Sequence, residues 1–152
     1  MGRQQGGRSQ TGQRQGEAMR EAAAHVGSLG NLKQWGTADL VSRAEAVGRE
    51  LSERKMTTSS IRNFLDEVNR IQAETQGRRE EFDSSRVILL KPLLAYSAGR
   101  EADRRKQEVL KSFANLFSAA ADTVHDAQDF KQFVEFTRAV VAFHRFHGGS
   151  NQ

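Results

Sequence analysis

Apolar residues recur at helical spacing along the chain after Gly36, and polar residues fill the positions between them. The clearest stripe follows the i, i+3, i+4, i+7 order of one face of an amphipathic helix and consists of Ile61, Phe64, Leu65, Val68 and Ile71. The alternating β-branched runs that would predict strands do not occur. The pattern therefore predicts an all-α protein, a compact bundle of about five helices.

The expected helices span about residues 37–53, 57–77, 82–96, 101–124 and 127–146. Thr37 or Asp39 is expected to cap the first, and Gly77 and Gly148 to end the second and the last. Because proline cannot continue a helical hydrogen-bond ladder, Pro92 should make the third helix kink or restart. On the first helix the residues expected to face inward are Leu40, Val41, Ala44, Val47 and Leu51. The apolar residues of the third are Phe82, Leu89, Leu90, Leu93, Leu94 and Tyr96.

The first 36 residues differ from the rest of the chain. They hold 8 of the 13 glycines, many glutamines and four arginines, which are Arg3, Arg8, Arg14 and Arg20. Such a segment has too little apolar surface to offset the entropy lost on ordering. We expect a flexible tail over residues 1–36, with a short helix at Glu17–Val26 as the alternative, and a helical domain over residues 37–149. The arginines could contact phosphate or merely keep the tail soluble.

Composition narrows the class of protein further. A chain of 152 residues fits one domain, and the absence of cysteine excludes disulfides and zinc–thiolate sites. No apolar run approaches the roughly 20 residues that span a bilayer, so we expect no membrane association and a cytoplasmic location. The 23 basic residues exceed the 19 acidic ones, a mild excess that suits a polyanionic partner without requiring one.

Signatures of catalysis do not occur in the sequence: it has no phosphate-binding loop, no His-Glu-x-x-His and no nucleophile elbow. His144 and His147 lie three residues apart, one helical turn, but no further ligands stand beside them. We therefore predict no catalytic residue, no metal site and no cofactor.

The basic residues give the more informative pattern. Lys131, Arg138 and Arg145 are spaced by seven, so they form a row beside the apolar face of the last helix, with a rise of roughly 10 Å between members. Arg62 flanks the stripe of the second helix, and Lys91 lies opposite Leu89. Further candidates for binding a nucleic-acid backbone are Lys55, Arg100 and Arg105. The alternative interpretation is a solvated edge whose long side chains cover the core.

Three segments resemble a known family. Thr57–Phe64 resembles its Thr-Ser-Gln-Ile-Arg-Lys-Phe motif, and Leu90–Arg100 resembles its Leu-Lys-Pro-Lys-Leu-Ala-Tyr-Ala-Ala-Gly-Arg signature. Val140–Gly149 is similar to its Ile-Val-Ala-Tyr-His-Lys-Tyr-Gly-Gly end. The family is the small subunit of the type III-A CRISPR (Csm) effector complex, and the resemblance covers about residues 55–149.

The resemblance implies a helical, non-catalytic subunit that acts in antiviral defence. Its partners would be guide RNA, target RNA and the other subunits of the complex. Copies would stack head to tail as the minor filament along the guide–target duplex, while cleavage belongs to other subunits.

The matched basic positions are Arg62, Lys91 and Arg100, with Arg145 where a lysine is usual, and Tyr96 and Pro92 are expected to serve packing at the bend. Ser60 replaces a glutamine and Leu93 a lysine, so any RNA contact that the family makes through that glutamine or lysine is lost here. The alternative functions are an assembly module without RNA contact, a small nuclease and a helix-turn-helix regulator.

Overall fold

The computed structural model describes residues 16–78 and 82–152, and these ranges form helices joined by short turns. The helices are α2 (Glu17–Ser28), η1 (Leu32–Gln34), α3 (Thr37–Glu53), η2 (Thr58–Ile61), α4 (Arg62–Thr75), α5 (Ser85–Ile88), α6 (Leu90–Gly99), α7 (Arg104–Ala121) and α8 (Ala127–Phe146). Within the described residues, extended pairing is limited to one isolated bridge between Thr57 and Ser150. The predicted all-α fold class is confirmed.

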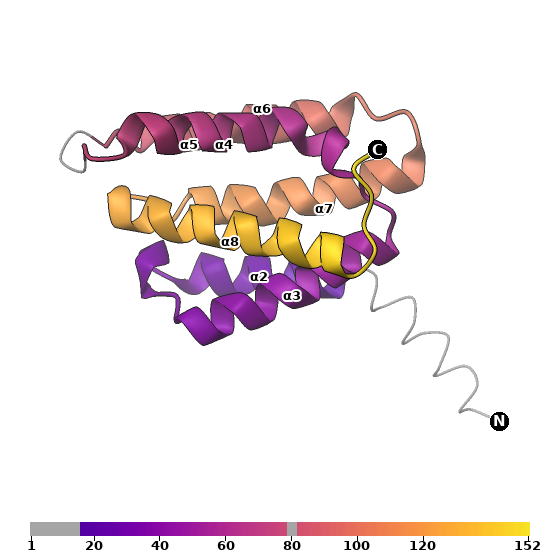
Figure 1. The fold of residues 1–152 in the computed structure, drawn as a ribbon, viewed down its shortest axis with the longest axis horizontal. Helices are drawn as coiled ribbons and strands as arrows, with labels where there is room; N and C mark the ends of the chain where they lie inside the picture. Colours follow the sequence, from indigo (N-terminus) through magenta and orange to yellow (C-terminus); the bar gives the residue numbers. More distant parts are fainter. Residues whose placement is uncertain (1–15, 79–81) are drawn as a thin grey trace.

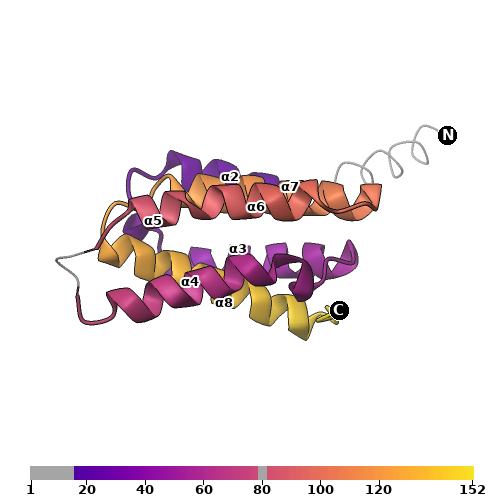
Figure 2. The same ribbon diagram turned by 90° about the horizontal axis from the view of Figure 1, so that it is seen from above.

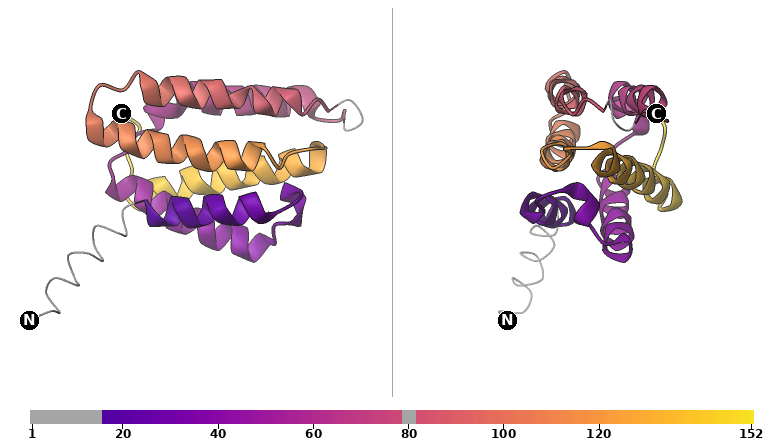
Figure 3. Two further views of the ribbon diagram at one scale, coloured as in Figure 1. Left: turned by 180° about the vertical axis from the view of Figure 1, so that it is seen from behind. Right: turned by 90° about the vertical axis from the view of Figure 1, so that its left-hand side faces the viewer.

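The helices are arranged in three tiers of two (Figure 1). α4 and the α5–α6 pair form one outer tier, α7 and α8 the middle tier, and α2 and α3 the other outer tier (Figure 3). Figure 2 shows the same bundle as two stacks, one of α6, α7 and α2 and the other of α4, α8 and α3. The middle tier is therefore covered on both sides, which explains the wide apolar face of α8.

A cluster of phenylalanines fills the centre of the bundle. Phe64 of α4 packs edge-on against Phe113 and Phe117 of α7, with ring centroids 5.7 and 5.4 Å apart. Phe117 also contacts Phe133 and Phe136 of α8, and all five rings are buried. Burial of side chains of this size stabilises a fold by about 1.5–3 kcal/mol each. The cluster therefore joins an outer tier to the middle one.

Two of the long helices begin at an aspartate whose side chain caps the first turn. Asp103 and Asp126 cap α7 and α8 by accepting hydrogen bonds from the amides of Lys106 and Asp129, at 3.0 and 2.8 Å. The predicted capping of α3 by Thr37 or Asp39 was wrong, because Gly36 occupies the N-cap position without a side-chain hydrogen bond.

The predicted tail was too long. Residues 16–36 belong to the folded bundle: α2 buries Met19, Ala22 and Val26. After it, Trp35 is 2% exposed and packs 4.7 Å from the ring of Phe136. The remaining part of that predicted tail, residues 1–15, lies outside the described residues.

Pro92 has the predicted effect on the third helix, which stops after α5 and restarts as α6. Of the apolar residues predicted on this helix, Leu90 and Leu94 are buried, whereas Leu89 and Tyr96 are 64% and 62% exposed. Val41 on α3 was expected inward and is 42% exposed. In the part of the chain that is described, no helix combines the length and apolar character needed to cross a membrane.

Candidate nucleic-acid interface

The segment after α8 returns over η2 and fixes the end of the bundle. The amide of Thr58 donates to the carbonyl of Ser150 at 3.1 Å, and that of Ser59 donates to Asn151 at 3.0 Å. The Asn151 side-chain oxygen accepts from the Thr58 hydroxyl at 3.0 Å and from Arg145 Nη1 at 2.9 Å. Asn151 therefore joins the hydroxyl-rich segment Thr57–Ser60, which we call the cap cluster, to Arg145, the last member of the basic row on α8.

A first hollow lies on one side of this cap cluster. It has a volume of about 360 Å³ and is lined by Lys55, Arg100 and Lys106 together with the polar side chains of Thr57, Ser59, Ser60 and Glu101. We call it the Arg100 hollow. Its lining thus combines three cationic side chains and one carboxylate with several hydroxyl groups. This combination can accept a phosphate group by charge and by hydrogen bonding.

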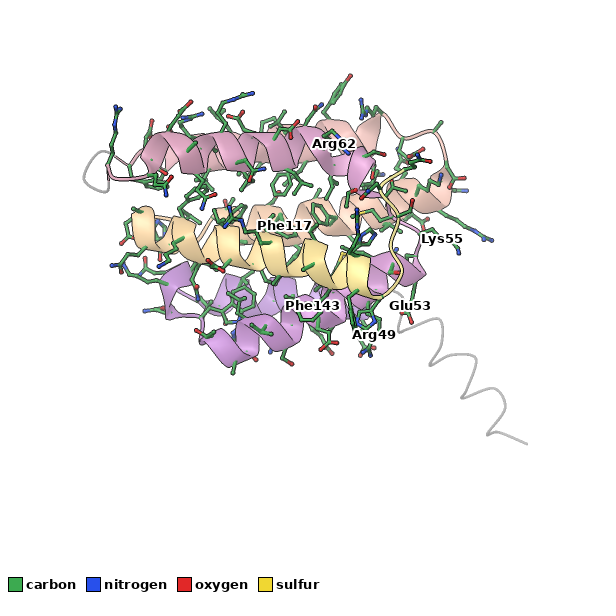
Figure 4. The ribbon with its side chains drawn as sticks, viewed as in Figure 1. Arg49, Glu53, Lys55, Arg62, Phe117 and Phe143 are labelled. Atoms are coloured by element: carbon green, nitrogen blue, oxygen red, sulfur yellow. The ribbon has the colours of Figure 1, made fainter. Side chains whose placement is uncertain are left out.

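A second hollow lies on the other side of the cap cluster. It has a volume of about 450 Å³ and is lined by Arg62 and Arg145, with Thr58, Asp66, Asn69 and Asn151 among its polar residues. Figure 4 shows Arg62 and Lys55 at the same end of the bundle, beside the C-terminal segment. Segments far apart in the sequence thus bring predicted RNA-binding residues together.

The second hollow continues along the seam between α4 and α8. The next hollow shares Leu65, Asn69 and Val141 with it and adds Arg138, and a third shares Val134 with that one and adds Lys131. We call this continuous depression the α4–α8 groove. All three members of the predicted row line it, and Arg138 is held by a 2.7 Å hydrogen bond to Gln72. The groove is therefore lined by apolar side chains of α4 and α8, by the row of cations and by the carboxylates of Asp66 and Glu135.

Lys55 and Arg105 also line a further hollow of about 440 Å³, together with Arg54, Glu53 and Glu108. Lys55 belongs to both this hollow and the Arg100 hollow. Among the described residues it is the one non-glycine residue with positive φ, at 67°. This conformation is uncommon outside glycine and fixes the direction in which the lysine leaves the turn after α3.

Lys91 is the one predicted RNA-binding residue that lines none of the hollows described above. It lies nine residues before Arg100 on α6, roughly 13 Å away along the axis, and its ammonium group pairs with Asp122 at 2.8 Å. The expected packing role of Tyr96 was wrong, since its ring is exposed. The ring instead lies 5.7 Å below the Arg100 guanidinium, a cation–π contact that orients this arginine.

Sequence reasoning did not find Asn151 or Gln152 as part of the site, although both line its hollows. No periodic signal marks them, because their position depends on pairing with a segment more than ninety residues earlier.

The histidines of the last helix do not face one another. His144 is buried with Nε2 2.7 Å from the carbonyl of Met56, whereas His147 pairs with Glu45 at 3.2 Å. Over the ranges 16–78 and 82–152, no group of three or more potential metal ligands is found. The described hollows are lined by cations, hydroxyls and amides together with the carboxylates of Glu53, Asp66, Glu101 and Glu108.

The fold is a small helical bundle whose cationic side chains gather in neighbouring hollows at one end and along one side. Residues 35–150 match the model of the family Csm2 Type III-A. The chain belongs to this family, and is thus a small subunit of the type III-A CRISPR effector complex whose partners are the other Csm subunits. No curated protein matches the chain.

Proposed function

We propose that this subunit holds the backbone of the guide RNA–target RNA duplex against the α4–α8 groove and the Arg100 hollow, and performs no catalysis itself. The observation that supports this most strongly is the convergence of predicted cations on two connected sets of hollows at one side and one end of the bundle. Sequence would be read by base pairing between the two RNAs, and this chain would contact phosphates and 2′-hydroxyls.

The charges of the cations that line the hollows favour contact with phosphate groups. Within the described part of the chain, Arg62, Lys131 and Arg100 form no direct ion pair with an acidic side chain, although Asp66, Glu135 and Glu101 line the same hollows. Each phosphate neutralised releases condensed counterions, which gives binding a steep dependence on salt. Repeated copies would add avidity to weak individual contacts.

Self-association as a head-to-tail filament is the second part of the proposal. Such stacking requires two different complementary surfaces on each copy. The structure exposes apolar side chains in two separate regions: Ile88, Leu89 and Tyr96 on α5 and α6, and Phe146, which is 78% exposed, at the end of α8. Exposed apolar surface of this kind marks protein contacts.

The test is RNA binding by gel shift across a salt series, with single-stranded RNA and a guide–target duplex as probes. Changing Arg62→Ala and Arg100→Ala together should weaken binding and lower the slope of log K against log salt by about 0.7–0.9 for each phosphate that is no longer neutralised. Circular dichroism should show unchanged helicity, because both side chains are exposed.

Arg70→Ala is the matched control. Arg70 lies on the same helix as Arg62, is exposed and pairs with Glu67, but lines none of the described hollows. It should leave RNA binding unchanged. Equal binding by the Arg62/Arg100 variant and the wild type would contradict the proposed site.

A second candidate function is assembly without RNA contact, which the exposed apolar residues favour. It predicts association with the other Csm subunits that is insensitive to salt, and no shift of either RNA. Purification of the complex from its native host distinguishes the two candidates, since a guide RNA cross-linked to this subunit supports only the first.

A further inference from the structure

One large aromatic side chain on the outside of the bundle is left uncovered. Tyr96 lies on α6, which belongs to an outer tier (Figure 1), and it is 62% exposed. Over the ranges 16–78 and 82–152, its ring has one aromatic or charged partner, the Arg100 guanidinium 5.7 Å from the ring centre, and its hydroxyl group has no hydrogen-bond partner. Packing within the fold therefore does not explain an aromatic ring at this position.

The end of α6 joins this ring to the Arg100 hollow. Arg100 follows Tyr96 by four residues, and its amide donates to the Tyr96 carbonyl at 3.0 Å, so the two side chains lie on one face of the helix end. Arg100 also lines the hollow of about 360 Å³, a volume within the range of small-molecule sites. Lys55 and Lys106 add two further cations to that lining. The exposed ring and the cationic hollow thus share one arginine.

An aromatic ring beside cations is typical of sites that bind unpaired nucleotides. Aromatic rings and guanidinium planes stack on the faces of bases, while neighbouring cations hold the phosphates. Within a continuous duplex these faces are covered by the adjacent bases, so a side chain reaches them only where a base is unpaired or splayed out. A protein contact is the other use of an exposed tyrosine, but the exposed apolar side chains Ile88 and Leu89 lie at least seven residues earlier. Seven residues correspond to roughly 10 Å along a helix, so the charged surroundings of Tyr96 favour a nucleotide.

We propose that Tyr96 and Arg100 form a stacking platform for one unpaired base of the bound RNA, and that the adjacent phosphate lies in the Arg100 hollow. The proposal rests on the proposed function, which supplies the RNA, and it adds a contact with a base to the contacts with the backbone. Each subunit then has one position at which an unpaired nucleotide binds better than a paired one. Stacking depends on a free base being present rather than on its identity.

The test measures the affinity of the full chain for three RNA duplexes that differ at one internal position. One is fully paired, one has a single unpaired nucleotide there, and one has an abasic residue in place of that nucleotide. Tyr96→Leu should lower the affinity for the duplex with the unpaired nucleotide by a factor of about 5–150, the contribution of stacking one base on an aromatic ring. It should leave the other two affinities nearly unchanged, and also the slope of log K against log salt, because no charge is removed. Tyr96→Phe keeps the ring and should retain the wild-type preference.

Phe146→Leu is the matched control. Its ring is 78% exposed, like that of Tyr96, but it lines none of the hollows described above. This variant should leave all three affinities unchanged.

The outcomes separate the stacking platform from the proposed function. Equal losses of affinity for all three duplexes in Tyr96→Leu overturn the platform, because the ring would then act only by orienting Arg100. Unchanged affinity for the duplex with the unpaired nucleotide also overturns it, and weaker self-association of the same variant in sedimentation would assign Tyr96 to a protein contact. In these cases, loss of binding to the paired duplex in Arg62→Ala leaves the proposed function intact. Absence of any RNA binding by the wild-type chain overturns both.

Discussion

A close approach between α3 and α8 gives a sharp prediction about stability. At Gly48 of α3, a Cβ would lie 2.7 Å from the backbone nitrogen of His144 and 2.7 Å from Cβ of Phe143 on α8. Figure 4 shows Phe143 where these two helices meet. Carbon atoms in good contact are about 3.5–4.0 Å apart, so Gly48→Ala must separate α3 from α8 locally by roughly 0.8 Å or more.

The expected cost follows from this overlap. Overpacking of a well-packed core costs about 1–3 kcal/mol, and here the obstacle is backbone that cannot rotate away. Alanine in place of glycine in a helix returns up to about 1 kcal/mol. We therefore expect Gly48→Ala to lower the free energy of unfolding by about 1–2 kcal/mol, and Tm by roughly 2–8 °C for a domain of this size.

Gly27→Ala is the matched control, because a Cβ on Gly27 of α2 meets nothing within 4 Å. It should raise the free energy of unfolding by up to about 1 kcal/mol through helix propensity alone. Urea denaturation followed by circular dichroism measures both variants. If Gly48→Ala were as stable as the wild type or more so, the close packing of α3 against α8 would be refuted.

Two further predictions concern carboxylates. Glu50→Ala should lower the free energy of unfolding by about 1–3 kcal/mol in urea denaturation, because it removes the acceptor of the Ala18 amide and the partner of Arg54 at 3.3 Å. Glu50→Gln keeps the acceptor and should cost much less, and similar costs for the two variants would contradict this. The hydrogen bond from Lys33 lowers the pKa of Asp126. The stabilising contribution of the Asp126 carboxylate should therefore be present at neutral pH and decline as the pH falls below about 4. Denaturation at several pH values should show a smaller acid-induced destabilisation for Asp126→Asn than for the wild type.

Long periodic segments with clear ends could be predicted well from the sequence. The bounds expected for the first and last helices agree with α3 and α8, since apolar spacing persists over several turns and glycine residues follow at Gly148 and Gly149. The predicted boundary between the tail and the helical domain was placed too late in the chain, because the inner face of α2 is short, with Met19, Ala22 and Val26 as its buried residues. Glycine-rich composition outweighed the spacing of these three residues, which did carry a helical signal.

Around Pro92 the sequence did not separate the inner from the outer apolar residues. Proline breaks the hydrogen-bond ladder between α5 and α6, so one continuous stripe does not tell that Leu90 and Leu94 are buried while Leu89 and Tyr96 are exposed. The site was predictable only as a set of cations. Which of them meet, as Arg62 meets Arg145 in one hollow, and which are neutralised, as Lys91 is by Asp122, depends on contacts between distant segments.

The position of Trp35 supplies a natural optical reporter for one tier of the bundle. Its indole nitrogen donates to Asp39 at 2.7 Å, its ring lies 5.7 Å from His25 of α2, and it is the only tryptophan in the chain. Its fluorescence therefore comes from the junction of α2, α3 and α8 alone. A red shift of the emission while far-ultraviolet ellipticity persists would show that α2 leaves the bundle before the rest of the molecule unfolds.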